Sequence, residues 1–173
     1  MRTIWILGDQ LMADHPALAG GPHPESVVLM IESHARGAVH RYHQVKLALV
    51  YAAMRHRAAG LRAAGWRVDY HALTSDDTAD NRFEPTLRAH CERFGTTNLA
   101  MAEPHSLRER SVVQRLAELL GLPLTMSPGT QFLLTREAFA HWARGRRTLL
   151  MEDHYREMRR RFGWLMTATG DPA

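Results

Sequence analysis

Short apolar runs alternate with longer amphipathic stretches through the first 126 residues of the chain. The first two runs, Arg2–Leu7 and Ser26–Ile31, are apolar almost without interruption, which is typical of strands covered on both faces. Such strands need helices on either side of their sheet, and the amphipathic stretches supply them. The alternation therefore predicts an α/β fold: a doubly wound, Rossmann-like sheet of five parallel strands with helices on both faces.

The remaining elements follow from the same patterns. Each of the three expected helices in this region is followed directly by a glycine, which is typical of a helix end. The further strands are expected at Trp66–Leu73, Asn98–Ala102 and Leu122–Met126. The helices are expected at His40–Ala64, Phe83–Phe94 and Ser106–Leu120.

The last part of the chain has a different character. A length of 173 residues corresponds to about one domain, and we assign residues 1–134 to the α/β domain. Residues 135–173 are expected to form a helical segment, with helices at Arg136–Ala143 and Leu149–Leu165, that leads into a linker.

The composition excludes several classes of protein. No apolar run approaches the roughly 18 residues of a membrane span, and Ile4–Leu7 is too short for a signal peptide. Cys91 is the only cysteine, so the chain has no internal disulfide and no cysteine-ligated iron–sulfur cluster. We expect a cytoplasmic protein with no membrane partner. The net charge of +4 is too small to indicate nucleic-acid binding by itself.

Polar residues follow three of the expected strands at the edge where open parallel sheets bind ligands. Gly8, Asp9, Gln10 and Leu11 follow the first strand, Glu32 the second and Glu103 the fourth. Carboxylates at this edge suit ribose or ribityl hydroxyls and ring N–H groups better than a bare phosphate. Singly, Asp9 could cap a turn and Glu32 could be solvated; the three together favour a ligand site.

Familiar catalytic and phosphate-binding motifs are missing. The sequence has no GxGxxG after its first strand, no GxxxxGK[ST] and no GxSxG. His40 and His43 lie three residues apart at the start of the long helix, but no third ligand follows at a defined spacing, so we assign no metal site. We expect His43 and Lys46 to point from this helix start toward the carboxylates.

The arginines near the end of the chain are the best nucleic-acid candidate. Their spacing puts Arg156, Arg159 and Arg160 on one side of a helix, opposite an apolar stripe with Phe162. A docked amphipathic helix with a solvated basic face explains the pattern equally well. The pattern therefore leaves both interpretations open.

Six segments of the chain, taken in order, resemble one family: the prokaryotic photolyase-related proteins, which are the bacterial (6-4) photolyases and cryptochromes with an iron–sulfur cluster. Each segment alone has low specificity, but the ordered set spans nearly the whole chain and is quite specific. The segments are Ile6–Leu11, Tyr42–Lys46, Ala53–His56, Gly65–Tyr70, Glu103–Pro104 and Tyr155–Arg160.

The resemblance implies that this chain is the N-terminal α/β antenna domain of such a protein. Members bind an antenna chromophore, 6,7-dimethyl-8-ribityllumazine, in this domain. Their C-terminal helical domain, which these 173 residues do not contain, holds FAD, a [4Fe–4S] cluster and the DNA lesion. DNA would then be a partner of the full-length protein.

The resemblance also implies which residues form the chromophore pocket. Gly8, Asp9, Gln10 and Leu11 would form one wall, and Glu32 and the start of the His40–Ala64 helix the other. At two positions where the family has an acidic and an aromatic pocket residue, this chain has Arg36 and Val39. An arginine there removes an acceptor and adds a charge, so a flavin, another pterin-like chromophore or an empty pocket is also compatible.

Three functions follow in order of preference. The first is a light-harvesting, chromophore-binding domain of a DNA-repair or blue-light photoreceptor protein. The second is a stand-alone photolyase-like binding or interaction module without light chemistry. The third is an enzyme that acts alone on a nucleotide-like substrate, for which no nucleophile, metal set or phosphate loop is evident. The lyase activity of a photolyase would need the FAD domain, so enzyme activity of this chain is left open.

Overall fold

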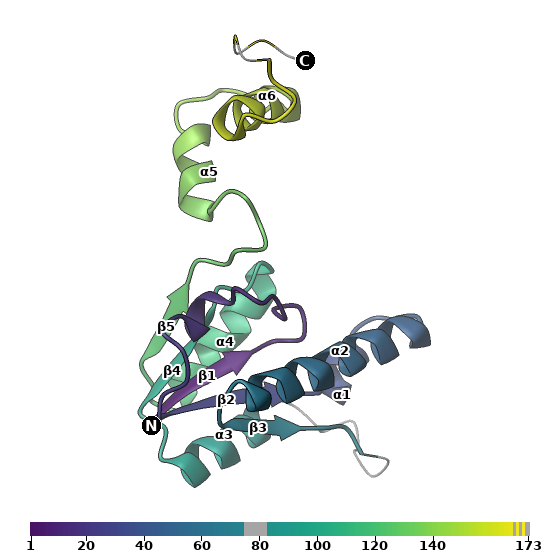
Figure 1. Ribbon diagram of the computed structural model, residues 1–173, viewed down its shortest axis with the longest axis vertical. Coiled ribbons are helices and arrows are strands. Elements are labelled where there is room, and N and C mark those ends of the chain that lie inside the picture. The colour runs from purple at the N-terminus through teal and green to yellow at the C-terminus, as the bar shows by residue number, and fades with distance from the viewer. Residues whose placement is uncertain (75–82, 168, 170, 172–173) are drawn as a thin grey trace. The chain divides into compact units, whose positions relative to one another are not determined.

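The structure is a computed structural model that describes residues 1–74, 83–167, 169 and 171, except for the side chain of Arg36. The chain divides into two compact units, Met1–Leu133 and Leu134–Ala173, which we describe separately. Figure 1 shows the sheet with its helices in the first unit and a pair of helices in the second.

The first unit is built on a sheet of five strands in the order β3-β2-β1-β4-β5 (Figure 1). Every pair of neighbouring strands is parallel, as the sequence predicts. The strand order reverses between β1 and β4, so this is the topological switch point at which such sheets bind ligands. The strands are β1 (Arg2–Ile6), β2 (Ser26–Ile31), β3 (Val68–His71), β4 (Asn98–Ala102) and β5 (Leu124–Ser127).

Helices cover both faces of this sheet, which confirms the doubly wound prediction. α2 covers one face, and α3 and α4 cover the other (Figure 1). The elements of the first unit are a 3-10 turn η1 (Pro16–Leu18), α1 (His34–Gly37), α2 (Gln44–Ala63), α3 (Phe83–Phe94) and α4 (Leu107–Leu119).

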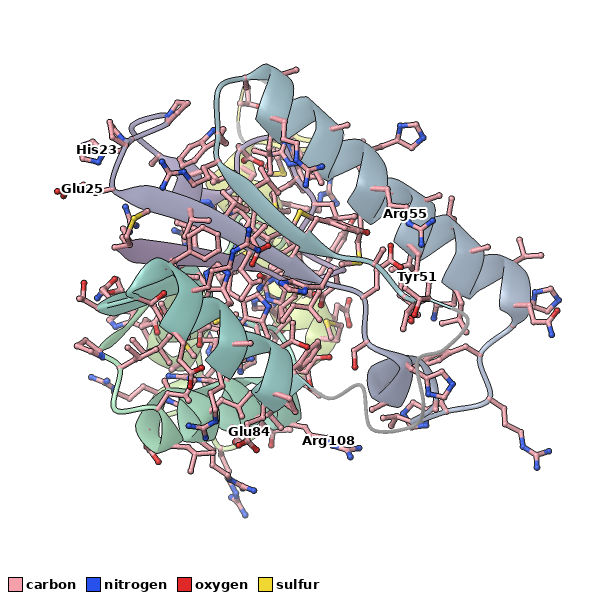
Figure 2. The ribbon with its side chains drawn as sticks, turned by 90° about the horizontal axis from the view of Figure 1, so that it is seen from below. His23, Glu25, Tyr51, Arg55, Glu84 and Arg108 are labelled. Carbon is pink, nitrogen blue, oxygen red and sulfur yellow. The ribbon has the colours of Figure 1, made fainter. Side chains whose placement is uncertain are left out.

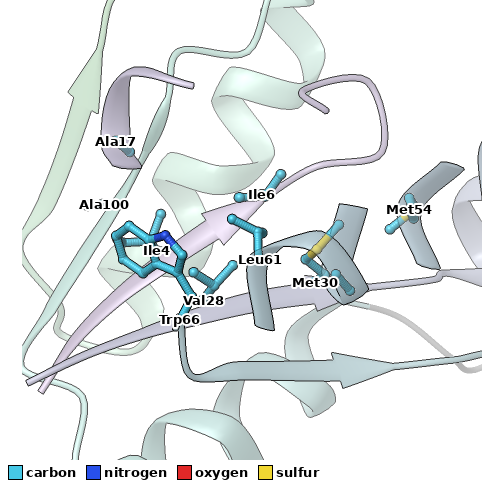
Figure 3. Close-up of a cluster of buried hydrophobic side chains, with 10 residues drawn as sticks. Ile4, Ile6, Ala17, Val28, Met30, Met54, Leu61, Trp66 and Ala100 are labelled. Carbon is cyan, nitrogen blue, oxygen red and sulfur yellow. The ribbon is translucent and has the colours of Figure 1, made fainter. Parts of the chain in front are cut away.

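Side chains that alternate along the strands build two apolar cores. On the α2 side, Ile4 and Val28 of the sheet pack with Met54 and Leu61 of α2 (Figure 3). On the other side, Trp5 and its neighbours pack against α3 and α4. This second core includes Trp5, Leu29, Ile31, Leu87, Leu99, Met101, Val113 and Leu116. Burial of alternate residues on both sheet faces explains why β1 and β2 are apolar without a break.

The long helix begins four residues later than predicted. α2 starts at Gln44, and His43 is its N-cap, with the ring Nδ1 accepting a hydrogen bond from the Val45 backbone N–H at 3.2 Å. His40 lies in a turn outside the helix, so the predicted pair His40 and His43 does not share a helical face. A ring nitrogen that satisfies an otherwise unpaired helix N–H accounts for His43.

The second unit contains α5 (Arg136–Ala143) and α6 (Met151–Phe162). The rings of Phe139 and Trp142 on α5 lie 5.4 and 4.6 Å from the ring of His154 on α6, measured between centroids. α6 ends at Gly163, whose φ of 66° is in the left-handed region that favours glycine. None of the helices in the described part of the chain has both the length and the apolar character that a membrane span needs.

Candidate functional site

A cavity of about 770 Å³ opens at the carboxyl ends of β1 and β2. Leu7, Gly8 and Asp9 border it at the end of β1, and Ile31 and Ser33 border it at the end of β2. α1 and α2 line one side, and the first turn of α3 with residues 108–116 of α4 line the other. The volume is within the range of small-molecule sites, which is about 300–1,000 Å³.

The lining combines apolar walls with charged groups at the edge. Tyr51 projects from α2, whereas Glu84 and Arg108 come from the helices of the opposite sheet face (Figure 2). The apolar lining residues include Val39, Leu47, Val50, Met54, Phe83, Val112 and Val113. The charged ones are Asp9, Lys46, Glu84, Arg108, Glu109 and Arg115. Such a cavity can hold a flat ring between apolar side chains and give its polar edge charged partners.

Two tyrosines shape the α2 side of the cavity. The Tyr51 hydroxyl donates a hydrogen bond to the Ser33 carbonyl at 3.2 Å, which ties α2 to the segment that follows β2. Burial and the nearby Glu32 carboxylate raise the pKa of Tyr51, so it stays a neutral donor. Lys46 places its ammonium 4.7 Å from the centre of the Tyr42 ring, a cation–π contact at the cavity edge.

Gly8 is a point of close approach between the β1 loop and α2. A Cβ at this position would lie 3.1 Å from Met54 Sδ and 3.3 Å from Val50 Cγ1. Both neighbouring side chains also line the cavity. The glycine therefore lets α2 pack directly against the end of β1.

The structure brings some of the sequence-predicted site residues together and separates others. Gly8, Asp9, Val39 and Lys46 line the cavity. Gln10 is buried, and its amide bridges strand ends by donating to the Ala102 carbonyl at 2.9 Å. These placements give four of the predicted residues access to a ligand and give Gln10 a supporting position.

Three more of the predicted residues are engaged elsewhere. Leu11 packs against the core on the α2 side, and His43 caps α2. The Glu103 carboxylate pairs with Arg110 of α4 at 2.7 Å. Arg36 lies in α1, and its side chain is outside the described part of the structure.

Glu32 lies in a network of donors at the end of β2. Its fully buried carboxylate accepts two hydrogen bonds from Arg55, at 2.6 and 2.8 Å, one from Tyr70 and one from the Leu73 backbone N–H. Burial favours the protonated acid, but the hydrogen bonds from Arg55, Tyr70 and Leu73 outweigh it and hold the pKa of Glu32 below its usual value. Glu32 thus joins α2, β2 and β3 as an ionised carboxylate.

Sequence reasoning missed the α4 side of the cavity. Arg108, Glu109, Val112 and Arg115 lie on α4 and line the site. The available signal was topological, because a helix that follows β4 starts beside the end of β1 wherever the strand order reverses between them. The pattern of polar residues after strand ends points to Glu103, which precedes this helix, and gives no signal for the helix itself.

The arginines of α6 border a separate cavity of about 530 Å³ within the second unit. Arg156, Arg159 and Arg160 line it with Glu152 and Asp171. Arg156 pairs with Glu152 at 2.6 Å, and the Arg159 guanidinium donates to the Trp164 carbonyl at 3.2 Å. Two arginines of the predicted basic face, Arg156 and Arg159, therefore have partners within the second unit.

Comparisons with known proteins give two matches. The model of the family described as "Deoxyribodipyrimidine photo-lyase-related protein" matches residues 4–173. A protein of Agrobacterium fabrum (strain C58 / ATCC 33970), named "(6-4) photolyase", is 33% identical over 165 residues. The match covers 95% of this chain and 32% of the relative, so the chain spans about a third of the relative's length.

Proposed function

Because this chain belongs to the family of deoxyribodipyrimidine photolyase-related proteins, we propose that its first unit is an antenna domain. The chromophore would occupy the cavity at the carboxyl ends of β1 and β2 and absorb near-UV or blue light. Its excitation energy would pass to FAD in another domain of a photolyase or cryptochrome.

The observation that carries this proposal is the cavity itself. It lies at the ligand-binding edge of the sheet, has a volume of about 770 Å³, and combines an apolar interior with polar groups. A chromophore with a flat ring and a polyhydroxyl chain needs both kinds of surface. The proposed ligand is 6,7-dimethyl-8-ribityllumazine.

The lining residues have separate roles in this proposal. Leu47 and Val50 would pack on the ring and exclude water, and Asp9 would accept hydrogen bonds from ribityl hydroxyls. Lys46 and Arg108 would face the carbonyl edge of the ring. Glu32, which accepts four hydrogen bonds from three residues of the protein, would hold the cavity wall in place rather than bind the ligand.

This function requires orientation rather than bond chemistry. The protein would hold the ring at a fixed angle and keep water from quenching its excited state. FAD would bind outside these residues. The [4Fe–4S] cluster would also bind elsewhere, because Cys91 alone cannot supply a set of cysteine ligands.

Reconstitution tests the proposal directly. The purified chain, titrated with 6,7-dimethyl-8-ribityllumazine, should quench or shift the fluorescence of the ligand with one site per chain. Asp9→Ala should weaken this binding at least about tenfold, as expected for loss of charge-assisted hydrogen bonds to the ligand. Asp14→Ala, an exposed carboxylate in the same loop that does not line the cavity, is the matched control. Equal affinity of Asp9→Ala and the unaltered chain would refute the assignment.

A binding or interaction module without light chemistry is the second candidate. Val39 favours it, because the side chain that lines the cavity here is aliphatic where the resemblance implies an aromatic ring. In that case neither the lumazine nor a flavin nor a pterin would bind in the titration. Val39→Tyr would then be expected to create binding that the unaltered chain lacks.

DNA is the proposed partner of the full-length protein. Arg160 and its neighbours on α6 would contact phosphates of the DNA. The ion pair between Arg156 and Glu152 would reduce the contribution of Arg156. The chain alone should bind duplex DNA weakly and with a shallow dependence on salt. A steep salt dependence would assign α6 a larger part in DNA binding.

A further inference from the structure

Two histidines and an aspartate converge between the edge strand β3 and α3. Asp69 and His71 are two residues apart on β3 and so share the face that α3 covers, and His90 is on α3. One oxygen of Asp69, Oδ2, lies 2.6 Å from His90 Nδ1 and 3.0 Å from His71 Nε2. One candidate ligand atom from each residue lies within 4.8 Å of the other two.

From this arrangement we propose that Asp69, His71 and His90 bind a divalent transition-metal ion, with Zn²⁺ as the reference ion and water completing its coordination. Two imidazoles with one carboxylate are typical ligands of zinc and its neighbours, whereas Mg²⁺ and Ca²⁺ prefer oxygen ligands. The ion would tie the edge strand to α3. The site lies apart from the cavity, because none of its three residues is in the cavity lining, so the inference does not rest on the proposed function.

The orientation of the side chains already suits a metal. His90 presents Nδ1 and His71 presents Nε2 to the same oxygen of Asp69, Oδ2. Ring nitrogens and carboxylate oxygens are the atoms through which these residue types bind metals.

A hydrogen-bond chain behind His90 can adapt to metal binding. The far ring nitrogen, Nε2, lies 3.0 Å from the Thr3 hydroxyl, which lies 2.8 Å from the Thr96 hydroxyl. Either threonine can be the donor. When Nδ1 binds a metal, the ring proton moves to Nε2 and donates to Thr3, and Thr3 donates to Thr96 instead. No proton leaves the site, and a second residue orients the ligand, as is usual for metal-bound histidines.

The residues around this site leave a path by which the ion can enter, and they place one competing cation, Arg93, beside it. His71 is 36% exposed in its side chain, so an ion can enter from the strand edge. Arg93 lies 3.6 Å from the other Asp69 oxygen, Oδ1, and its charge opposes a cation. The Arg93 side chain is 70% exposed and can turn into solvent when the ion binds.

Calorimetric titration of the 173-residue chain, purified without a polyhistidine tag and treated with EDTA, tests the proposal. ZnCl₂ should bind with one ion per chain and a micromolar or tighter Kd, and MgCl₂ should not bind. His71→Gln, which keeps a polar group at the exposed edge of the site, should weaken Zn²⁺ at least about tenfold. His56→Ala removes an exposed histidine on α2 and should leave the affinity unchanged.

Three further measurements separate ligation from a purely structural role. Co²⁺ should acquire strong visible absorption in the unaltered chain but not in His71→Gln. Thr3→Val, which removes only the hydroxyl that orients His90, should weaken Zn²⁺ by about tenfold. Arg93→Gln should tighten it. Absence of stoichiometric Zn²⁺ binding, or an equal affinity of the chain and His71→Gln, would overturn the proposal.

Discussion

Arg55 on α2 donates two hydrogen bonds, at 2.6 and 2.8 Å, to the fully buried carboxylate of Glu32 at the end of β2. The Arg55 side chain is 56% exposed, so the pair joins a buried anion to a cation that remains hydrated. This arrangement avoids much of the cost of burying two charges. It also fixes α2, which forms one side of the cavity, to the strand whose end forms another.

Glu32→Gln should therefore lower the free energy of unfolding by about 2–4 kcal/mol. The amide keeps the size of the side chain but loses the charge and turns an NH₂ group toward the Arg55 donors. Denaturant unfolding followed by circular dichroism gives the change. Glu84→Gln, which breaks the exposed pair of Glu84 with Arg88 at 3.1 Å, is the control and should cost less than about 0.5 kcal/mol.

Glu32 also predicts an acid limb in the pH profile of stability, which is a fall in the free energy of unfolding at acidic pH. The pKa of Glu32 is lowered from 4.5 by folding, so its contribution is fully present above about pH 4.5 and is lost as the pH falls through the folded value below it. Glu32→Gln should remove this limb. An unchanged slope below pH 4.5 in the variant would show that other carboxylates determine acid unfolding.

The burial of His15 predicts a second range of pH, above that of Glu32, in which stability falls on acidification. Its side chain is 2% exposed, and neither ring nitrogen has a hydrogen-bond partner among the described residues. Burial and the charge of Arg57 lower its pKa from 6.5 to about 4. As the pH falls, the unfolded chain binds a proton at this histidine before the folded chain does. The free energy of unfolding should therefore fall by about 3 kcal/mol between pH 6.5 and pH 4. His15→Leu should flatten this window, whereas exposed His56→Ala should leave it unchanged.

Most of the fold could be predicted because its signals are local. The apolar run Ser26–Ile31, the amphipathic Phe83–Phe94 and the run Asn98–Ala102 coincide with β2, α3 and β4. α1 was missed because four residues, His34–Gly37, carry no helical period. Strand Trp66–Leu73 was predicted too long, since only Val68–His71 pair with β2.

The site was harder to predict because its parts depend on long-range packing. Asp9 and Lys46 could be placed at the cavity from their position after β1 and at the start of α2. The role of Glu32 depends on Arg55, 23 residues away, and on Tyr70, 38 residues away. No spacing rule connects them. The same holds for Asp69 and His90, which meet only when α3 packs on β3.

Replacement of glycine by alanine should have opposite effects on stability at Gly8 and at Gly60. Gly8→Ala would put a methyl group 3.1 Å from Met54 Sδ, so it should lower the free energy of unfolding by about 1–2 kcal/mol and weaken chromophore binding. Gly60→Ala, inside α2 with nothing within 4 Å of the new Cβ, should raise the free energy of unfolding by about 0.5–1 kcal/mol. Thermal unfolding of both variants measures the difference. A stabilising Gly8→Ala would show that α2 moves away from β1 without cost.

Filling the cavity separates binding there from binding elsewhere on the chain. Val112 on α4 lines the cavity and is 38% exposed, so Val112→Trp can direct its indole into the cavity without disturbing the core. We expect lumazine affinity to fall at least about tenfold, because the ring loses its space, while the unfolding midpoint changes little. Leu119→Trp lies on the same helix at a position that is 56% exposed and outside the lining, and should keep full affinity. Equal affinities in the two variants would place the chromophore outside this cavity.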